Sequence, residues 1–412
     1  MPASVVIVGG GVMGAAVACF LARDHGATVC VVERDPTFAR ASSALSASSI
    51  RQQFSTPVNI ALSQASLAFL RRAHEELAVD GDGPALGFVE AGYLYLASPD
   101  GAATLRELQS LQAAHGADVR LLDRDAMARR WPWLAVADIA CGSWGASGEG
   151  WFDGPALHAA LRRKARERGV HFETGEVRSI ESRGTHAVAV RCADGRRFAA
   201  DHLVLAAGAW TAPLAAQLGL ELPVSPKKRD VFVLESPAAL PGCPLLIDPS
   251  GVWLRPEGIA RPQGLAGRPP EGARAPSQRP QGGLFLAGAP PRDSDPDEPP
   301  LEAVDHGLVD EVLWPVLARR IPAFEALRVR AAWAGYYEVN AFDHNGVVGT
   351  LPGWHNAHIA CGFSGHGMQH APAVGQGLAR WIAEGRWDAV DLTPLSPERL
   401  LRGERLLERN II

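Results

Sequence analysis

The feature that most constrains this chain is a glycine turn close to its N-terminus. The apolar run VVIV (residues 5–8) leads into GGGVMG (residues 9–14), and an apolar helical pattern follows over residues 15–23. An unbroken apolar run is typical of a parallel strand that is buried on both faces. A second such run, residues 28–32, ends in Glu33, about 20 residues beyond the turn, where a carboxylate can accept hydrogen bonds from ribose hydroxyls. The order strand, glycine turn, helix, strand and acid predicts a dinucleotide-binding unit.

Each residue of the turn has an expected task. Gly9 permits the tight turn, Gly11 lets the backbone approach a pyrophosphate, and Gly14 lets the helix pack closely on the strand. The phosphates then face the free N–H groups and the positive end of the helix dipole. We therefore expect Val12 and Met13, at the start of the helix, to contact the cofactor as well.

The composition argues against several classes of protein. The 412 residues carry a formal charge of −5, so no basic excess points to nucleic acid. No apolar run approaches the roughly 20 residues needed to cross a bilayer. The first strand begins within a few residues of Met1, so we expect no signal or transit peptide. The six cysteines are scattered, without CxxC or metal-ligand spacing, which predicts reduced thiols, no metal site and a cytoplasmic protein.

A second glycine-rich loop, CGFSGHGM (residues 361–368), lies near the other end of the chain. A short strand precedes it at residues 358–360, and a helix is expected from about residue 371 to 385, with Pro372 in its first turn. This loop has no acidic partner, so it serves another part of the ligand. Reduced isoalloxazine carries negative charge, which a helix N-terminus stabilises, whereas nicotinamide has no such requirement. The second loop therefore favours FAD over NAD, with an NAD dehydrogenase as the alternative.

The remaining pattern predicts an α/β protein whose nucleotide domain is interrupted by a second domain. Residues 87–97 and much of 225–289 read as strands outside the nucleotide fold, while the buried strand at 201–208 returns to it. The expected segments are an FAD-binding domain of residues 1–85, 146–224 and 328–393, a substrate domain of residues 86–145 and 225–327, and a charged helical tail of residues 394–412. Within the substrate domain, residues 258–282 are rich in glycine, proline and arginine, and are predicted to be a lid or a disordered insertion.

Three motifs together resemble one group of flavoenzymes. The N-terminal turn, LAAGAW (residues 205–210) and GFSGHG (residues 362–367) resemble the D-amino-acid-oxidase/sarcosine-oxidase (DAO) family of FAD enzymes, and the likeness covers nearly the whole chain. Within this group the resemblance is strongest to mitochondrial members that assist assembly of respiratory complex I. Long strings carry it: IRQQFSTPVNIALS (50–63), EGWFD (149–153), WAGYYEVNAFDHNGVVG (333–349), GFSGHGMQHAP (362–372) and NII (410–412). Because no leader precedes the first strand, we expect a bacterial relative.

The resemblance implies an interrupted Rossmann domain, an antiparallel-sheet substrate domain and oxidation of an amine at the flavin. Arg51 matches an arginine that binds the substrate carboxylate, and a guanidinium suits that task because it offers a bidentate fork. A structural salt bridge is the other interpretation of Arg51. Tyr337 matches an active-site tyrosine, and His366 is expected to position the flavin or to be purely structural. Trp253, Trp333 and Tyr336 are either core residues or aromatic walls of the substrate site.

The sequence departs from the family pattern at three lysine or cysteine positions. Gln369 stands where the family has a second carboxylate-binding group, a lysine, and Phe285 stands where it has the lysine that assists oxygen activation. Gly335 replaces the cysteine that links covalently to flavin, and no histidine lies between Glu33 and Arg51 to form the other linkage. The resemblance therefore implies non-covalent FAD, with oxygen or a quinone or other electron carrier as the acceptor.

The candidate catalytic residues are Arg51, Tyr337, His366 and Gln369. The candidate cofactor-binding residues are Gly9, Gly11, Val12, Met13, Gly14, Glu33, Arg34, Ser42, Ser43, Ser49, Val177, Ala207, Gly208, Trp210, Gly335, Gly365, His366, Gly367 and Met368. The leading hypothesis is an enzyme that oxidises an N-substituted, sarcosine-like amino acid by hydride transfer to flavin N5, giving an imine. The alternatives are a D-amino-acid dehydrogenase, and a flavin-bearing assembly factor of a respiratory complex with little turnover.

Overall fold

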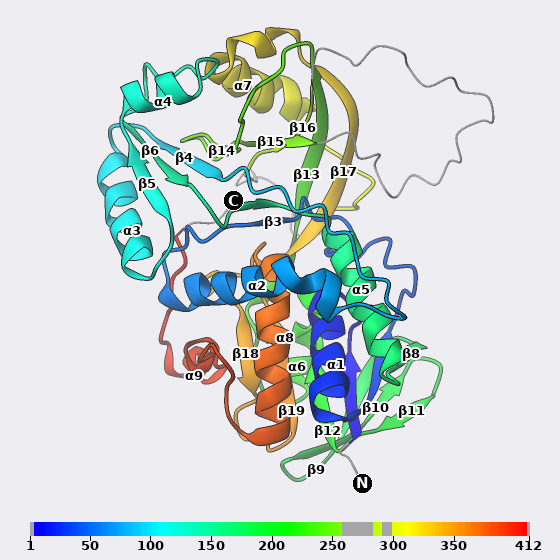
Figure 1. The fold of residues 1–412 in the computed structure, drawn as a ribbon. Coiled ribbons are helices and arrows are strands. Elements are labelled where there is room, and N and C mark those ends of the chain that lie inside the picture. Colours follow the sequence, from blue (N-terminus) through cyan, green and yellow to red (C-terminus); the bar gives the residue numbers. More distant parts are fainter. Residues whose placement is uncertain (1–3, 258–282, 291–298, 410–412) are drawn as a thin grey trace, which may run out of the picture.

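Two sheets organise the chain, one at each end of an elongated molecule (Figure 1). The computed structural model describes residues 4–257, 283–290 and 299–409. The predicted insertion at residues 258–282 therefore lies outside the described residues.

The first sheet is the nucleotide-binding sheet. Its strand order is β18-β19-β12-β1-β2-β8, all parallel except β18. The strands are β1 (Ser4–Val8), β2 (Thr28–Glu33), β8 (His171–Thr174), β12 (His202–Leu205), β18 (Val347–Thr350) and β19 (Ala357–Cys361). Residues 5–8 are at most 5% exposed, as the unbroken apolar run predicts.

Both faces of this sheet are covered. On one face pack the helices α1 (Val12–His25), α2 (Pro57–Glu76), α5 (Gly154–Glu167) and α8 (Gly367–Glu384). On the other lie α6 (Ala212–Ala216) and a three-stranded sheet of β9 (Val177–Arg183), β10 (His186–Cys192) and β11 (Arg197–Ala199). Successive side chains of β1 point to opposite faces of the sheet. Val5 and Ile7 therefore belong to the core on the first face, and Val6 and Val8 to the core on the second.

The second sheet is mostly antiparallel and has the order β17-β13-β16-β15-β14-β4-β6-β5. Its strands are β4 (Tyr93–Ala97), β5 (Val119–Leu122), β6 (Cys141–Gly145), β13 (Val224–Ser236), β14 (Leu245–Ile247), β15 (Trp253–Glu257), β16 (Gly283–Gly288) and β17 (Arg328–Asn340). The helices α3 (Ala102–Ala114), α4 (Arg124–Arg130) and α7 (Trp314–Arg320) lie around it (Figure 1). The predicted α/β class, with a Rossmann-type domain and a second, antiparallel-sheet domain, is confirmed.

The predicted boundary at residue 328 is wrong for β17. This strand pairs with β13 along its whole length, from Val224 opposite Asn340 to Glu235 opposite Arg328. It therefore belongs to the second sheet, and its far end carries residues 335–338 toward the nucleotide domain. The strand itself is visible in the sequence, but its pairing partner lies about 100 residues away and leaves no local signal.

Three helix predictions are also corrected. The helix expected over residues 371–385 begins earlier, at Gly367, so that Pro372 lies inside it. The helix tolerates this proline because the φ of proline is close to helical and only one backbone N–H is missing. The sequence of residues 301–320 also suggests one continuous helix, but the structure has a short π-helix, η2 (Val309–Leu313), followed by α7.

The tail is the third. Up to residue 409, the last that the structure describes, the tail holds only η4 (Thr393–Leu395) and α9 (Glu398–Arg402), since Gly403 has a left-handed φ of 68° and ends the helix. Beyond it, Glu408 is 1% exposed and accepts hydrogen bonds from Ser55 N–H (2.8 Å) and Asn59 Nδ2 (3.0 Å) at the start of α2. The tail therefore docks through the Glu408 carboxylate on the segment before α2 and on the first turn of that helix.

The six cysteines are free thiols, as predicted, and five of them are buried. Across the described ranges, no helix combines the length and the apolarity needed to cross a membrane.

The packing of α1 on α8 gives a first prediction. A Cβ at Gly375 would lie 2.6 Å from Ala16 Cβ and 2.9 Å from the backbone carbon of the same residue. The two helices would have to move apart, so Gly375→Ala should lower the free energy of unfolding by about 1–3 kcal/mol, measured by urea denaturation. Gly101→Ala is the control, since its Cβ would meet nothing closer than 3.7 Å. Equal stability of the two variants would contradict the packing argument.

Candidate cofactor site and active site

The glycine turn adopts the geometry that phosphate binding requires. Gly9 has a φ of 101°, and a Cβ there would lie 2.4 Å from the carbonyl oxygen of Ala206 on the neighbouring strand end. A Cβ at Gly14 would lie 1.9 Å from the carbonyl oxygen of Gly9. Gly11 faces open space, where a Cβ would meet only Ser43 Oγ at 3.8 Å. The backbone at Gly11 is therefore open to close approach by a ligand.

Glu33 connects the end of β2 to this turn. Its Oε2 accepts a hydrogen bond from Gly10 N–H at 2.7 Å, and its Oε1 accepts one from Asp35 N–H at 2.9 Å. The carboxylate is thereby fixed at the rim of the cavity, where ribose hydroxyls would meet it.

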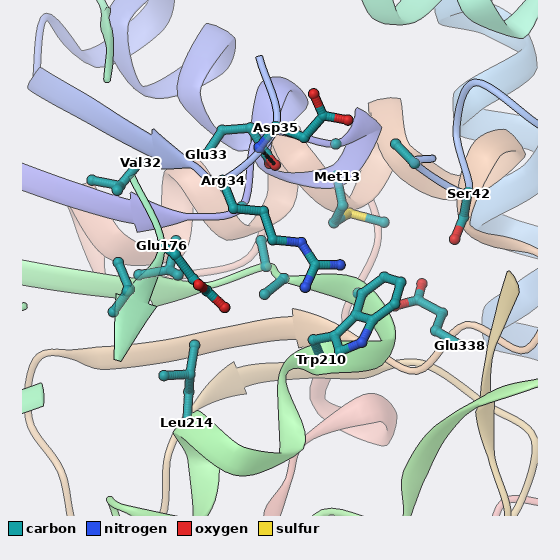
Figure 2. A pocket seen from close by; sticks show the side chains of 18 of the residues that line it. Met13, Val32, Glu33, Arg34, Asp35, Ser42, Glu176, Trp210, Leu214 and Glu338 are labelled. Carbon is teal, nitrogen blue, oxygen red and sulfur yellow. Dashed lines mark hydrogen bonds between the residues drawn. The ribbon is translucent and has the colours of Figure 1, made fainter. Parts of the chain in front are cut away.

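A cavity of about 320 Å³ begins at the turn, lies along the ends of β1, β2 and β12, and reaches Glu338 on β17 (Figure 2). Its lining includes twelve of the predicted cofactor residues: Gly9, Gly11, Val12, Met13, Glu33, Arg34, Ser42, Ser43, Val177, Ala207, Gly208 and Trp210. The Arg34 guanidinium lies 4.0 Å above the ring of Trp210, and both project into the pocket (Figure 2). The two side chains come from different strand ends, so only the fold brings them together.

The residues present fit the ADP half of FAD. Ser43 is 6% exposed, and its Oγ has no hydrogen-bond partner although it lies beside Gly11. A buried hydroxyl without a partner is costly, and a phosphate oxygen would satisfy it. The free N–H groups at the start of α1 converge on the same place.

Seven of the predicted cofactor residues lie outside this cavity lining: Gly14, Ser49, Gly335, Gly365, His366, Gly367 and Met368. Gly14 packs behind the turn instead of lining the cavity. Gly365 has a φ of 96° and lies against the ring of Tyr337, 2.5 Å from where its Cβ would be. Ser49 Oγ accepts a hydrogen bond from the Tyr93 hydroxyl and so faces the second sheet.

Three of the four predicted catalytic residues, Arg51, His366 and Gln369, form one cluster. The fourth, Tyr337, contacts this cluster through Gly365. Arg51 is 4% exposed, and its Nη2 lies 3.4 Å from His366 Nε2. The guanidinium carbon lies 4.4 Å over the ring of Phe54. Gln369 Oε1 accepts a hydrogen bond from the backbone N–H of Arg51 at 2.9 Å and another from Ser63 Oγ at 3.2 Å. Gln369 is therefore a support of the Arg51 backbone, which its place as a family lysine does not predict.

His366 is held neutral by its surroundings. Burial, the charge of Arg51 and the neighbouring His370 lower its pKa well below the usual value. Its Nδ1 lies 2.6 Å from the carbonyl oxygen of Phe363, so Nδ1–H donates there and Nε2 is left to accept from Arg51. A neutral imidazole in this tautomer orients the guanidinium.

Glu149, which is not among the residues predicted for the site, holds the loop that carries Arg51. It is fully buried and accepts hydrogen bonds from Gln52 N–H (2.6 Å), Gln53 N–H (3.1 Å) and Gln53 Nε2 (2.9 Å). Burial outweighs these bonds and raises the pKa of Glu149 to about 7. The only sequence signal is its place at the start of EGWFD, a motif otherwise noted for resemblance alone.

The three aromatic residues considered as walls are mainly structural. Trp333 Nε1 donates to the carbonyl of Leu45 at 2.9 Å, the Tyr336 hydroxyl donates to Pro299 at 2.7 Å, and Trp253 lies in the core. Over the part of the chain that the structure describes, no three His, Cys, Asp or Glu side chains gather in a way that could hold a metal ion.

A Rossmann-type sheet, a phosphate-binding turn and a cavity leading to a second sheet define an FAD-binding oxidoreductase. Residues 4–381 match the family model described as FAD dependent oxidoreductase (DAO), and the chain belongs to that family. It is 40% identical to "FAD-dependent oxidoreductase domain-containing protein 1" of Xenopus laevis, over 100% of this chain and 85% of that protein.

Two solved structures share the fold. L-proline dehydrogenase from P. horikoshii superimposes with a TM-score of 0.80 at 24% identity, covering 98% of this chain and 99% of that one. Glycine oxidase from Geobacillus kaustophilus gives a TM-score of 0.76 at 27% identity, covering 96% and 98%. The family to which the chain belongs binds FAD, so FAD is the cofactor of this cavity.

Glu149 gives a second prediction, on stability. A carboxyl with a usual pKa of 4.5 that rises to about 7 on folding is protonated in the folded chain while it ionises in the unfolded one. The stability of the wild type relative to Glu149→Gln should therefore fall as the pH rises from 4.5 to 7, by on the order of 3 kcal/mol, and level off above that. Urea unfolding at several pH values measures it. The exposed Glu404→Gln is the control, and a pH-independent difference for Glu149→Gln would refute the argument.

Proposed function

We propose that this protein oxidises a secondary or tertiary amine that carries a carboxylate, an N-substituted amino acid, with FAD as the hydride acceptor. The observation that carries the proposal is the buried guanidinium of Arg51. The likeness to glycine oxidase supports an amino-acid substrate of this kind.

Burying an arginine costs free energy unless its charge is paired and its N–H groups are hydrogen-bonded. Here three distant parts of the chain hold its loop: Gln369 from α8, Ser63 from α2 and Glu149 from the turn before β7 (Gly150–Trp151). Such support keeps the fork of a guanidinium in one orientation, which suits bidentate binding of a carboxylate.

The second sheet contributes an unsatisfied hydroxyl to the same region. Tyr95 on β4 is 9% exposed, and its hydroxyl has no hydrogen-bond partner. Burial raises the pKa of Tyr95, and the positive charge of Arg51 acts in the opposite direction. A substrate carboxylate could accept from both.

His366 and Tyr337 complete the proposed site. FAD, when bound, supplies the acceptor for the hydride. A neutral His366 fits oxidation of an uncharged amine, since it holds Arg51 in place without adding positive charge. Tyr337 packs on Gly365, with Arg229 lying 5.1 Å from its ring centroid, and forms the wall between the loop and the sheet.

Substitution of Arg51 tests this role. With Arg51→Lys, the concentration of an N-methyl amino acid that half-reduces the flavin without oxygen should rise about 30-fold, because the lysine keeps the charge but loses the bidentate fork, a difference of about 2 kcal/mol at a buried carboxylate contact. Stopped-flow bleaching of the flavin absorbance measures it. The matched control is an N-methyl amine without a carboxylate, whose weak reduction should not change. An equal loss for both substrates would contradict carboxylate binding.

The same panel separates the enzyme from the alternatives. Bleaching by D-amino acids alone would favour a D-amino-acid dehydrogenase. Absence of bleaching by N-methyl, cyclic and D-amino acids would favour a flavin-bearing assembly factor. Readmission of oxygen then distinguishes an oxidase from a dehydrogenase.

Phe285 is 2% exposed and packs on Phe324 in the core, so this position supplies no charged group for oxygen activation, which favours a carrier as acceptor.

Attachment of the flavin gives another prediction. Gly335 has no side chain to form a thioether. The atom nearest to the position that its Cβ would take is the Cβ of Leu45, at 3.0 Å. Acid precipitation should therefore release all of the yellow colour into the supernatant. Colour that stays in the pellet would show a covalent bond.

A further inference from the structure

Glu338 is a carboxyl group that lines the cavity beside the N-terminus of α8, and no role described so far uses it. It lies on β17 directly after Tyr337 and lines the cavity at the end opposite Val32 and Glu33 (Figure 2). Its Oε1 is 3.3 Å from where a Cβ of Gly367 would be, and its Oε2 is 3.6 Å from that of Gly208. The carboxyl group thus stands between the N-terminus of α8 and the turn η1 (Gly208–Trp210).

The position matters because of what the helix end offers. The free N–H groups and positive dipole end of α8 would stabilise negative charge on a reduced flavin. Burial raises the pKa of Glu338, while the backbone N–H groups of Gly362 and Phe363, just before that helix, lower it and so favour the ionised form. An ionised Glu338 therefore competes with the flavin for the same positive field and repels its charge.

We propose that the carboxyl group of Glu338 opposes the negative charge of the reduced flavin. It thereby makes the reduction potential of the flavin low and dependent on pH. The proposal rests on the binding of FAD and not on the identity of the amine.

The protonation of Glu338 supports this role. Burial raises its pKa to about 7, against the two backbone hydrogen bonds that lower it. Charge on the flavin would raise it further, so reduction above pH 7 would draw a proton onto Glu338. Below that range the carboxyl is neutral in both states and the repulsion vanishes.

Other titratable groups near Glu338 do not change charge in this range. On β19, burial and then Glu338 raise the pKa of Cys361 well above its usual value. At the start of α8, His366 is held neutral. On β13 the paired residue is Pro226, and Arg34 lies beyond Trp210, always charged.

The test is the potential of the holoprotein, measured from pH 5.5 to 9 by reduction with dithionite beside a dye of known potential. Glu338→Gln should have a higher potential than the wild type above pH 7, by at least tenfold in the equilibrium constant, or about 30 mV for a two-electron couple. The difference should vanish near pH 5.5. Glu338→Asp should restore part of the pH dependence, and Glu325→Gln, an exposed carboxylate, should match the wild type.

Identical potentials, or a difference that is the same at every pH, would overturn the proposal. If Glu338→Gln does not fold, proton uptake by the wild type decides: reduction at pH 7.5 in weak buffer with a pH indicator should take up more protons than at pH 9.5. Equal uptake would also overturn it. Because no amine is used, failure here and failure of amine oxidation are distinguishable.

Discussion

The close approach of backbones around Gly9 and Gly14 is the constraint on which the rest of the structure depends. These two glycines let β1, α1 and the end of β12 meet without intervening side chains, which leaves Gly11 and the helix N-terminus facing the cavity. A side chain at either position would push the strand from the helix and close the phosphate site. The packing of α8 on α1 through Gly375 extends the same arrangement to the flavin end.

The candidate active site depends on a second kind of contact, hydrogen bonds between segments far apart in the chain. Residues 51–54 have no regular structure of their own, and α2, α8 and the Glu149 turn hold them. Because these partners are buried, the supports can be strong without being numerous. Burial also shifts the pKa values of Glu149 and His366, so the electrostatics of this site follow from how the loop is held.

Local patterns predicted the elements well and their partners poorly. The strand over residues 329–339 is evident from its residues, yet its place in the second sheet follows from pairing with β13. Pro372 suggested a helix start because proline favours the first turn, whereas the helix begins at Gly367 and includes it. Gln369 was placed by resemblance at a substrate contact, but its amide oxygen binds the backbone of Arg51.

By itself the sequence determined the FAD-binding unit and the α/β class, because glycine spacing, buried strands and an acid at the end of β2 act over short distances. Only the tertiary structure decided how Arg51 is held, that Arg34 stacks on Trp210, and that Glu338 borders the cavity. The physical reason is that these side chains are positioned by residues hundreds of places away, through burial and hydrogen bonds that no local pattern of residues encodes.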